Sequence, residues 1–276
     1  MTRREFKEKC IELRHQDLSL KEISQVLSRP KTSVYFHIKN MPKTNFLLAR
    51  IKQENHIRLN RIRPNLRGIS WKGRHCKRFE KWTPGLVNLV AHSIFDGAIS
   101  KSGVVYYNSN TVLVDNFKTK MKLVYSHGPT TYNFNNVTRV CYHSAELRDM
   151  FEGKREELCT KILTFDVEKQ RAFLKAFFDD EGCITFAGRK RIVRGYQHND
   201  ETLFLIQKLL KNFDIESKVD TGFHEIVISR RTNVEKFAHK VNFTPGIKVN
   251  AKRSNSIWGR GLEKRHILEM AISSYL

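Results

Sequence analysis

Apolar residues follow a helical period near the start of the chain and a mixed helical and alternating pattern after it. Within the first forty residues we expect three helices, over 3–14, 20–27 and 31–39. Ser19 followed by Glu22 forms a capping box, which marks the start of the second of these helices. The pattern therefore predicts a small all-α module at the N-terminus.

The rest of the chain contains an internal repeat. Residues 86–107 and 171–191 each begin as an apolar helix, end that helix in an acid followed by Gly, and continue as an alternating strand. The acids are Asp96 and Glu181, so the offset between copies is 181 − 96 = 85 residues. Both copies read as helix, two strands, helix, two strands, helix. The sequence thus predicts two αββαββα units.

The acid at each helix end needs an explanation. Gly97 and Gly182 suit a helix end, because glycine tolerates the left-handed conformation found there. An acid at the same end is unfavourable, since the helix dipole is already negative there. Two such acids at equivalent positions make sense if the helices pack side by side and jointly hold a divalent cation, which prefers oxygen ligands.

The composition adds a charge argument. The chain has 276 residues, and 50 Lys and Arg against 28 Asp and Glu give a net charge of +22. This charge indicates a polyanionic partner, and an ordinary basic surface is the alternative. No apolar run approaches the roughly 18–20 residues that span a bilayer, and the N-terminus has no apolar signal region. We expect an intracellular protein of the cytoplasm, nucleoid or an organelle, without membrane contact.

The five cysteines are widely spaced along the chain. No two are separated by the two to four residues typical of zinc ligands. We interpret them as reduced thiols that act as small buried hydrophobic residues.

Charge is concentrated between the two modules. Residues 43–85 contain twelve Lys and Arg and two Asp and Glu, a net +10. A helical pattern over Asn45–Ile62 is lost after Pro64, where basic and aromatic residues mix, as in segments that follow a nucleic-acid backbone. A solvated linker is the alternative. The domain boundaries we expect are listed here: 1–42, an all-α domain; 43–84, a basic linker; 85–165, the first repeat; 166–276, the second repeat with a basic extension.

The N-terminal segment SLKEISQVLSRPKTSVYFHIK resembles the helix-turn-helix domains of resolvases and repressors. In that geometry the second helix of the pair enters the major groove of DNA. A helical bundle that serves only for packing is the alternative. The resemblance implies that the following residues face DNA: Lys31, Thr32, Ser33, Tyr35 and His37.

The two helix ends resemble the motif of the LAGLIDADG homing endonucleases. The motif positions correspond to Leu89–Gly97 (LVAHSIFDG) and Leu174–Gly182 (LKAFFDDEG), and the resemblance covers residues 84–276. It implies an α+β fold in which two pseudo-symmetric αββαββα repeats form a saddle-like pair of sheets, beside the all-α N-terminal domain. Two motifs in one chain imply a monomer.

The resemblance also implies an activity. Asp96 and Glu181 would be the catalytic acids and the ligands of Mg²⁺ or Mn²⁺. The reaction would be metal-dependent cleavage of both strands of double-stranded DNA at one long asymmetric site, by an enzyme of the intron-encoded kind. Two alternatives stay open. One is a DNA-binding transcriptional regulator that does not cut, and the other is a maturase that binds intron RNA during splicing.

Basic residues outside the N-terminal module are further candidates for DNA contacts. They lie in the linker, on the hairpins of the two sheets and in the C-terminal extension. They are Arg61, Arg63, Arg67, Lys72, Arg74, Arg139, Arg189, Lys190, Arg191, Arg194, Arg230, Arg231, Lys248, Lys252 and Arg253.

Overall fold

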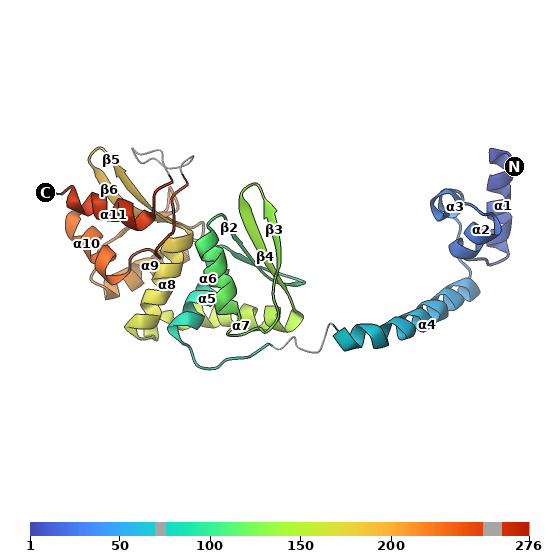
Figure 1. Ribbon diagram of the computed structural model, residues 1–276, viewed down its shortest axis with the longest axis horizontal. Helices are drawn as coiled ribbons and strands as arrows, with labels where there is room; N and C mark the ends of the chain where they lie inside the picture. The colour runs from blue at the N-terminus through green and yellow to red at the C-terminus, as the bar shows by residue number, and fades with distance from the viewer. Residues whose placement is uncertain (70–75, 251–260, 276) are drawn as a thin grey trace. The chain divides into compact units, whose positions relative to one another are not determined.

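The chain folds into two compact units, Met1–Gly73 and Arg74–Leu276. The structure is a computed structural model that describes residues 1–69, 76–250 and 261–275, with the backbone alone over 59–69 (Figure 1). None of its described helices is long and apolar enough to pass through a membrane.

Three short helices form the core of the N-terminal unit, as the sequence predicts. They are α1 (Arg3–His15), α2 (Leu20–Val26) and α3 (Lys31–Ile38). The predicted capping box is confirmed, because Ser19 N donates to Glu22 Oε2 at 2.7 Å and Glu22 N donates back to Ser19 Oγ. The buried core of these helices consists of Cys10, Ile23, Val34 and Ile38.

The fourth helix, α4 (Asn45–Ile69), is longer than the pattern predicts. We expected it to end at Ile62, before Pro64, and this was wrong. A proline removes one backbone hydrogen bond, and the Leu and Arg residues after it favour helix, so the helical backbone continues. The start of α4 is tied to the bundle by Arg50, whose Nη2 lies 2.6 Å from Glu22 Oε2.

The two repeats have the predicted order of elements, and both belong to the second unit (Figure 1). The first repeat consists of α5 (Pro84–Phe95), β1 (Gly97–Ser100), β2 (Gly103–Asn108), α6 (Thr111–Met121), β3 (Thr130–Phe134), β4 (Val137–His143) and α7 (Ala145–Lys161). A 3₁₀ turn, Ile162–Thr164, leads to the second repeat. That repeat consists of α8 (Val167–Asp180), β5 (Gly182–Ala187), β6 (Lys190–Tyr196), α9 (Asp200–Asn212), β7 (Lys218–Asp220), β8 (Glu225–Ile228) and α10 (Arg231–Lys240).

Each repeat builds one antiparallel four-stranded sheet. The strand orders are β1-β2-β4-β3 and β5-β6-β8-β7, so the second order repeats the first. The register also corresponds, because Gly97 pairs with Tyr106 in the first sheet and Gly182 pairs with Gly195 in the second. The two repeats are therefore related residue by residue through their strands as well as their helices.

The repeats share one hydrophobic core, in which α5 packs against α8. Ala91 and Ala176 are fully buried at this contact, where small side chains let two helices approach closely. Phe95 fits beside them because its ring meets the edges of Phe173 and Phe177, at centroid distances of 5.4 and 5.1 Å. The α+β fold with two αββαββα repeats is therefore confirmed.

The glycines after the two acids are needed for a different reason from the one we expected. Gly97 and Gly182 do not adopt the left-handed conformation. Instead, a Cβ atom on Gly97 would lie 2.4 Å from the carbonyl oxygen of Ser93, and one on Gly182 would lie 2.4 Å from that of Phe178. Each glycine lets the strand leave directly over the last helical turn, which fixes where the preceding acid points.

A final helix, α11 (Lys264–Ser273), is absent from our sequence-based expectations. It packs against β5 and α10, and its buried side is formed by Lys264, Ile267, Leu268 and Ala271. We interpreted this region as a basic extension on the strength of its Lys and Arg residues.

Candidate active site at the ends of two central helices

Asp96 and Glu181 occupy equivalent positions at the ends of the two central helices. Asp96 is the C-cap residue of α5 and Glu181 is that of α8. The same backbone bond holds each one, from Tyr107 N to Asp96 O at 2.9 Å and from Tyr196 N to Glu181 O at 3.2 Å. The fold thus places the two predicted acids on neighbouring, half-buried helix ends.

The local environment opposes ionisation of both acids. Burial, and then the charge of Asp180, raises the pKa of Asp96 to about 7. Burial, and then the charge of Asp96, raises the pKa of Glu181 to about 8. The buried Lys264 ammonium acts in the opposite direction on both acids. Anionic side chains are therefore held here at a cost that a bound cation would remove.

A third carboxylate, Asp180, lies beneath these acids in a buried hydrogen-bond network. Its side chain is fully buried, with Oδ2 2.7 Å from His92 Nδ1. Tyr106 donates its hydroxyl proton to Asp180 Oδ1 at 2.8 Å. Burial raises the pKa of Asp180 well above its usual range and lowers the pKa of His92, so it opposes the charged form of both groups. This network crosses from the first repeat to the second.

Asn108, at the end of β2, connects this network to Asp96. Its Nδ2 donates to Asp96 Oδ2 at 2.7 Å and lies 3.2 Å from the hydroxyl oxygen of Tyr106. Its Oδ1 accepts a hydrogen bond from Asn110 N at 2.8 Å, which fixes the orientation of the amide. The Asp96 carboxylate is consequently held from one side by a side chain that is itself held in place.

The neighbouring carboxylate Asp179 has a structural set of partners. Thr244 donates to it twice, from its backbone N at 2.8 Å and from Oγ1 at 2.6 Å. Lys264 Nζ donates to the Asp179 carbonyl at 2.8 Å, and Arg155 Nη2 lies 3.5 Å from the Ile94 carbonyl. A basic side chain, Lys264 or Arg155, thus lies at the C-terminal end of each central helix, where its positive charge offsets the negative end of the helix dipole.

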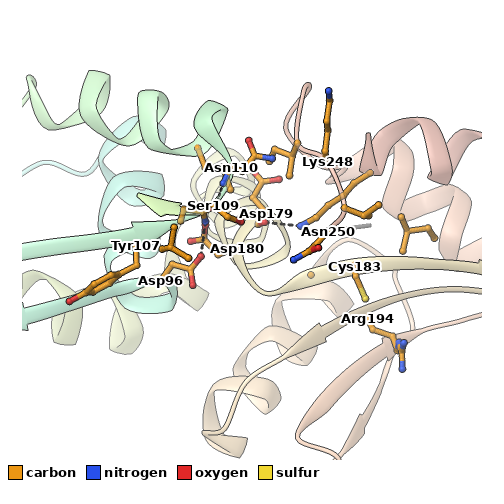
Figure 2. A pocket seen from close by; sticks show the side chains of 18 of the residues that line it. Asp96, Tyr107, Ser109, Asn110, Asp179, Asp180, Cys183, Arg194, Lys248 and Asn250 are labelled. Atoms are coloured by element: carbon orange, nitrogen blue, oxygen red, sulfur yellow. Dashed lines mark hydrogen bonds between the residues drawn. The ribbon is translucent and has the colours of Figure 1, made fainter. Parts of the chain in front are cut away.

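A pocket of about 480 Å³ opens beside the carboxylates (Figure 2). Asp96, Asp179 and Asp180 contribute to its wall, and Lys248 lies on the segment after α10 that borders it. Figure 2 shows Tyr107 on the first sheet and Arg194 on the second at opposite sides of this region. The pocket therefore belongs to both repeats.

The two acids at the helix ends suit a hard divalent cation; Asp96 lines the pocket, and Glu181 is not among its lining residues. Asp96 and Glu181 offer carboxylate oxygens, and the carboxylate of Glu181 accepts no hydrogen bond from the described residues. Within the described ranges, no three His, Cys, Asp or Glu side chains are grouped to hold one ion. Mg²⁺ keeps several water or substrate oxygens among its ligands, so one or two protein carboxylates at each ion fit its requirements.

The N-terminal residues predicted to face DNA lie along α3. Lys31, Thr32, Ser33 and Tyr35 are exposed, and His37 is half-buried, with its ring 5.4 Å from that of Phe6. This surface is available to a partner, and the role of α3 as a recognition helix stays a prediction.

The basic residues predicted on the two sheets divide into two groups. The exposed group consists of Arg139, Arg189, Lys190 and Lys248. Arg139 lies over the ring of Tyr107 at 5.6 Å. The members of the second group bind other parts of the chain. They are Arg191 with Ser274, Arg194 with Thr185 and Glu225, Arg230 with Glu216, and Arg231 with Glu235. Arg230 and Arg231 are exposed as well.

Seven further predicted contacts lie outside the described side chains. They are Arg61, Arg63, Arg67, Lys72, Arg74, Lys252 and Arg253.

Sequence reasoning missed four residues of this site, namely His92, Tyr106, Asn108 and Lys264. His92 carries a usable signal, because a polar residue inside an apolar helix at a core position requires a buried partner. Lys264 lies 85 residues beyond Asp179 in the sequence, and no local pattern connects them.

Comparison with known proteins identifies the second repeat. Residues 168–242 match the family model of the LAGLIDADG-like domain. No curated protein matches the chain. The solved structures that resemble it include mesophilic variants of the homing endonuclease I-DmoI (18% identity, TM-score 0.47, 59% of this chain and 94% of that chain). I-DmoI in complex with DNA and Mn is similar, with 19% identity and a TM-score of 0.47, over 57% of this chain and 96% of that chain. Full-length DUF199/WhiA from Thermatoga maritima is also similar, with 13% identity and a TM-score of 0.47, over 72% of this chain and 63% of that chain.

Proposed function

We propose that this chain, whose second repeat belongs to the LAGLIDADG family, is a site-specific DNA endonuclease that cuts both strands with the help of a divalent cation. Asp96 and Glu181 are the proposed catalytic acids and cation ligands. Double-stranded DNA is the proposed substrate, and Mg²⁺ or Mn²⁺ the proposed cofactor.

One observation carries the proposal, namely the pairing of two acids at equivalent helix ends in an environment that opposes their charge. Burial and neighbouring carboxylates raise the pKa of Asp96 to about 7 and that of Glu181 to about 8. Acids of this kind destabilise the fold when they ionise, and such acids cluster at functional sites. Binding of a divalent cation between negative groups supplies a functional reason for them.

The chemistry follows from these positions. A cation bound at each acid would activate water and stabilise the leaving 3′ oxygen of a phosphodiester. The protein's own part is to place the two carboxylates at the ends of α5 and α8, where the shared core fixes their separation. Asn108 holds Asp96, and Lys264 keeps both acids closer to their charged state.

Affinity for DNA would come from the basic surface. The net charge of +22 favours binding of a polyanion and makes the affinity depend strongly on salt. The exposed Arg139, Arg189, Lys190 and Lys248 are available for contacts from the sheet unit, and the exposed side of α3 is available from the N-terminal unit. We propose that these residues contact DNA.

Cleavage of DNA that contains a binding site selected by the protein tests this proposal. Purified protein should convert supercoiled plasmid to linear DNA in Mg²⁺ or Mn²⁺ and leave it intact in EDTA. Asp96→Asn and Glu181→Gln should each abolish linearisation while DNA binding persists. The matched control is Glu156→Gln, which changes an exposed glutamate on α7 and should cut normally. Linearisation by Glu181→Gln at the wild-type rate would refute the assignment.

A second candidate is a DNA-binding transcriptional regulator that does not cut. The separate N-terminal unit favours it, because an exposed α3 can serve DNA binding without any catalytic group. Tight binding to the selected site, without cleavage in either cation, would support this function. A maturase role with intron RNA stays a prediction from the family resemblance alone.

A further inference from the structure

The two proposed catalytic acids have different surroundings, although their backbones match. The bond from Tyr107 N to Asp96 O corresponds to the bond from Tyr196 N to Glu181 O. The strand register makes Gln197 the counterpart of Asn108, because each lies two residues beyond the partner of the first strand residue. Only the first repeat, however, uses this position to hold its acid.

The contacts at the two positions show this difference. Asn108 Nδ2 donates to Asp96 Oδ2 at 2.7 Å. Among the described residues, Gln197 makes a backbone bond to His224 O, and its amide makes no hydrogen bond to Glu181. Glu181 accepts no hydrogen bond on its carboxylate within the same described part of the chain. A hydrogen bond thus holds the Asp96 carboxylate before any ligand arrives, whereas none from the described residues holds the Glu181 carboxylate.

The support beneath Asn108 is also confined to one repeat. The hydroxyl of Tyr106 lies 3.2 Å from Asn108 Nδ2 and donates to Asp180, which also bonds to His92. Every member of this network has an apolar counterpart in the other repeat. Tyr106 corresponds to Gly195 by register, while His92 corresponds to Phe177 and Asp180 to Phe95 by the 85-residue offset.

We propose that Asn108 is a positioning residue that prepares the Asp96 carboxylate for a cation, so that the DNA strand served by Asp96 is cut before the strand served by Glu181. This inference rests on the proposed endonuclease function. Its physical basis is conformational. A restrained carboxylate loses little freedom when it binds a cation, whereas the longer Glu181 side chain must be ordered at that moment.

The test follows nicking of each strand separately. Plasmid DNA carrying the selected site is incubated with wild-type protein in Mg²⁺, and end-labelled fragments identify which strand is nicked first. Asp96→Asn and Glu181→Gln assign each strand to its acid. We expect wild-type protein to accumulate a nick in the strand assigned to Asp96.

Asn108→Ala should slow that nick by about tenfold to a hundredfold, the effect of losing a hydrogen bond to a charged group, and leave the other strand's rate unchanged. Asn108→Leu is of similar size, lacks the amide donor and adds no charge, and it should behave in the same way. The matched control, Gln197→Ala, should keep the wild-type order. Equal slowing of both strands, unchanged nicking, or the same effect in Gln197→Ala would overturn the proposal.

Binding of Mn²⁺ provides a readout that does not depend on cleavage. Electron paramagnetic resonance of Mn²⁺ added to the protein–DNA complex should detect a tighter and a weaker site in the wild type. Asn108→Ala should weaken the tighter site about tenfold or more, and Gln197→Ala should weaken neither. If the wild type binds Mn²⁺ in this way and never cuts, the endonuclease proposal fails while the positioning role stands. Two equal sites, or no Mn²⁺ binding, would refute the positioning role.

Discussion

Replacing Glu181 with glutamine should stabilise the protein at alkaline pH. The pKa of Glu181 is raised from 4.5 to about 8 in the folded chain, mainly by burial. A raised carboxyl pKa means that the folded state binds the proton more tightly than the unfolded state does. The free energy of unfolding of the wild type should therefore fall as the pH rises from about 4.5 to about 8. In Glu181→Gln this contribution to the pH dependence should be absent.

The size of the effect follows from the shift. At about 1.4 kcal/mol per pKa unit, the full shift corresponds to roughly 5 kcal/mol. Glu181 is partly exposed, and solvent screening reduces this figure, so we expect about 2 kcal/mol. For a unit of this size, that gain raises the melting temperature by about 4–8 °C.

Thermal unfolding at pH 5 and pH 8.5, followed by circular dichroism, measures the difference in melting temperature between Glu181→Gln and the wild type. The two proteins should melt at similar temperatures at pH 5, and the variant should melt higher at pH 8.5. The exposed Glu156→Gln serves as the control and should show no such pH dependence. Addition of Mg²⁺ at pH 8.5 should raise the melting temperature of the wild type more than that of Glu181→Gln. A variant that melts at or below the wild-type temperature at pH 8.5 would refute the electrostatic reasoning.

Three further substitutions test the packing and the caps. Gly195→Ala would place a Cβ atom 2.4 Å from the Phe177 ring, and should cost about 1–3 kcal/mol of unfolding free energy in urea titrations. Tyr106→Phe removes a donor from the buried Asp180 and should cost about 1–3 kcal/mol by the same measurement, whereas an unchanged midpoint would contradict the network. Ser19→Ala should destabilise α2 by about 1 kcal/mol, visible as faster amide hydrogen exchange in the N-terminal unit and not in the sheets.

The architecture of the second unit was predictable because each element depends on neighbouring residues, and because the same pattern occurs in both repeats. The apolar run of β2 and the helical period of α8 each follow from a few neighbouring residues, and each copy of the repeat supports the assignment of the other. The positions of Asp96 and Glu181 followed from the same comparison. The helix-turn-helix role of α3 and the DNA contacts of residues such as Arg189 stay predictions.

The remaining features depend on contacts between distant segments. Lys264 reaches the end of α8 from a helix that lies more than eighty residues later, and nothing near it in the sequence predicts that contact. Asn108 looks like an ordinary residue at a strand end, and its meaning appears only when β2 is placed beside Asp96. The continuation of α4 past Pro64 shows, in turn, that one unfavourable residue does not decide where a helix ends.

The hydrogen-bond network that joins His92 and Tyr106 of the first repeat to Asp180 of the second determines which repeats can pack together. If two copies of the second repeat packed together, Asp180 would face Phe177 and Gly195, and this buried carboxyl group would lose its hydrogen bonds to His92 and Tyr106. Two copies of the first repeat would place His92 and Tyr106 opposite Phe95, which offers them no hydrogen-bond partner. Either pairing leaves buried polar groups unsatisfied, which is costly. The contact between the repeats therefore favours the pairing of unlike halves over the pairing of two copies of the same half.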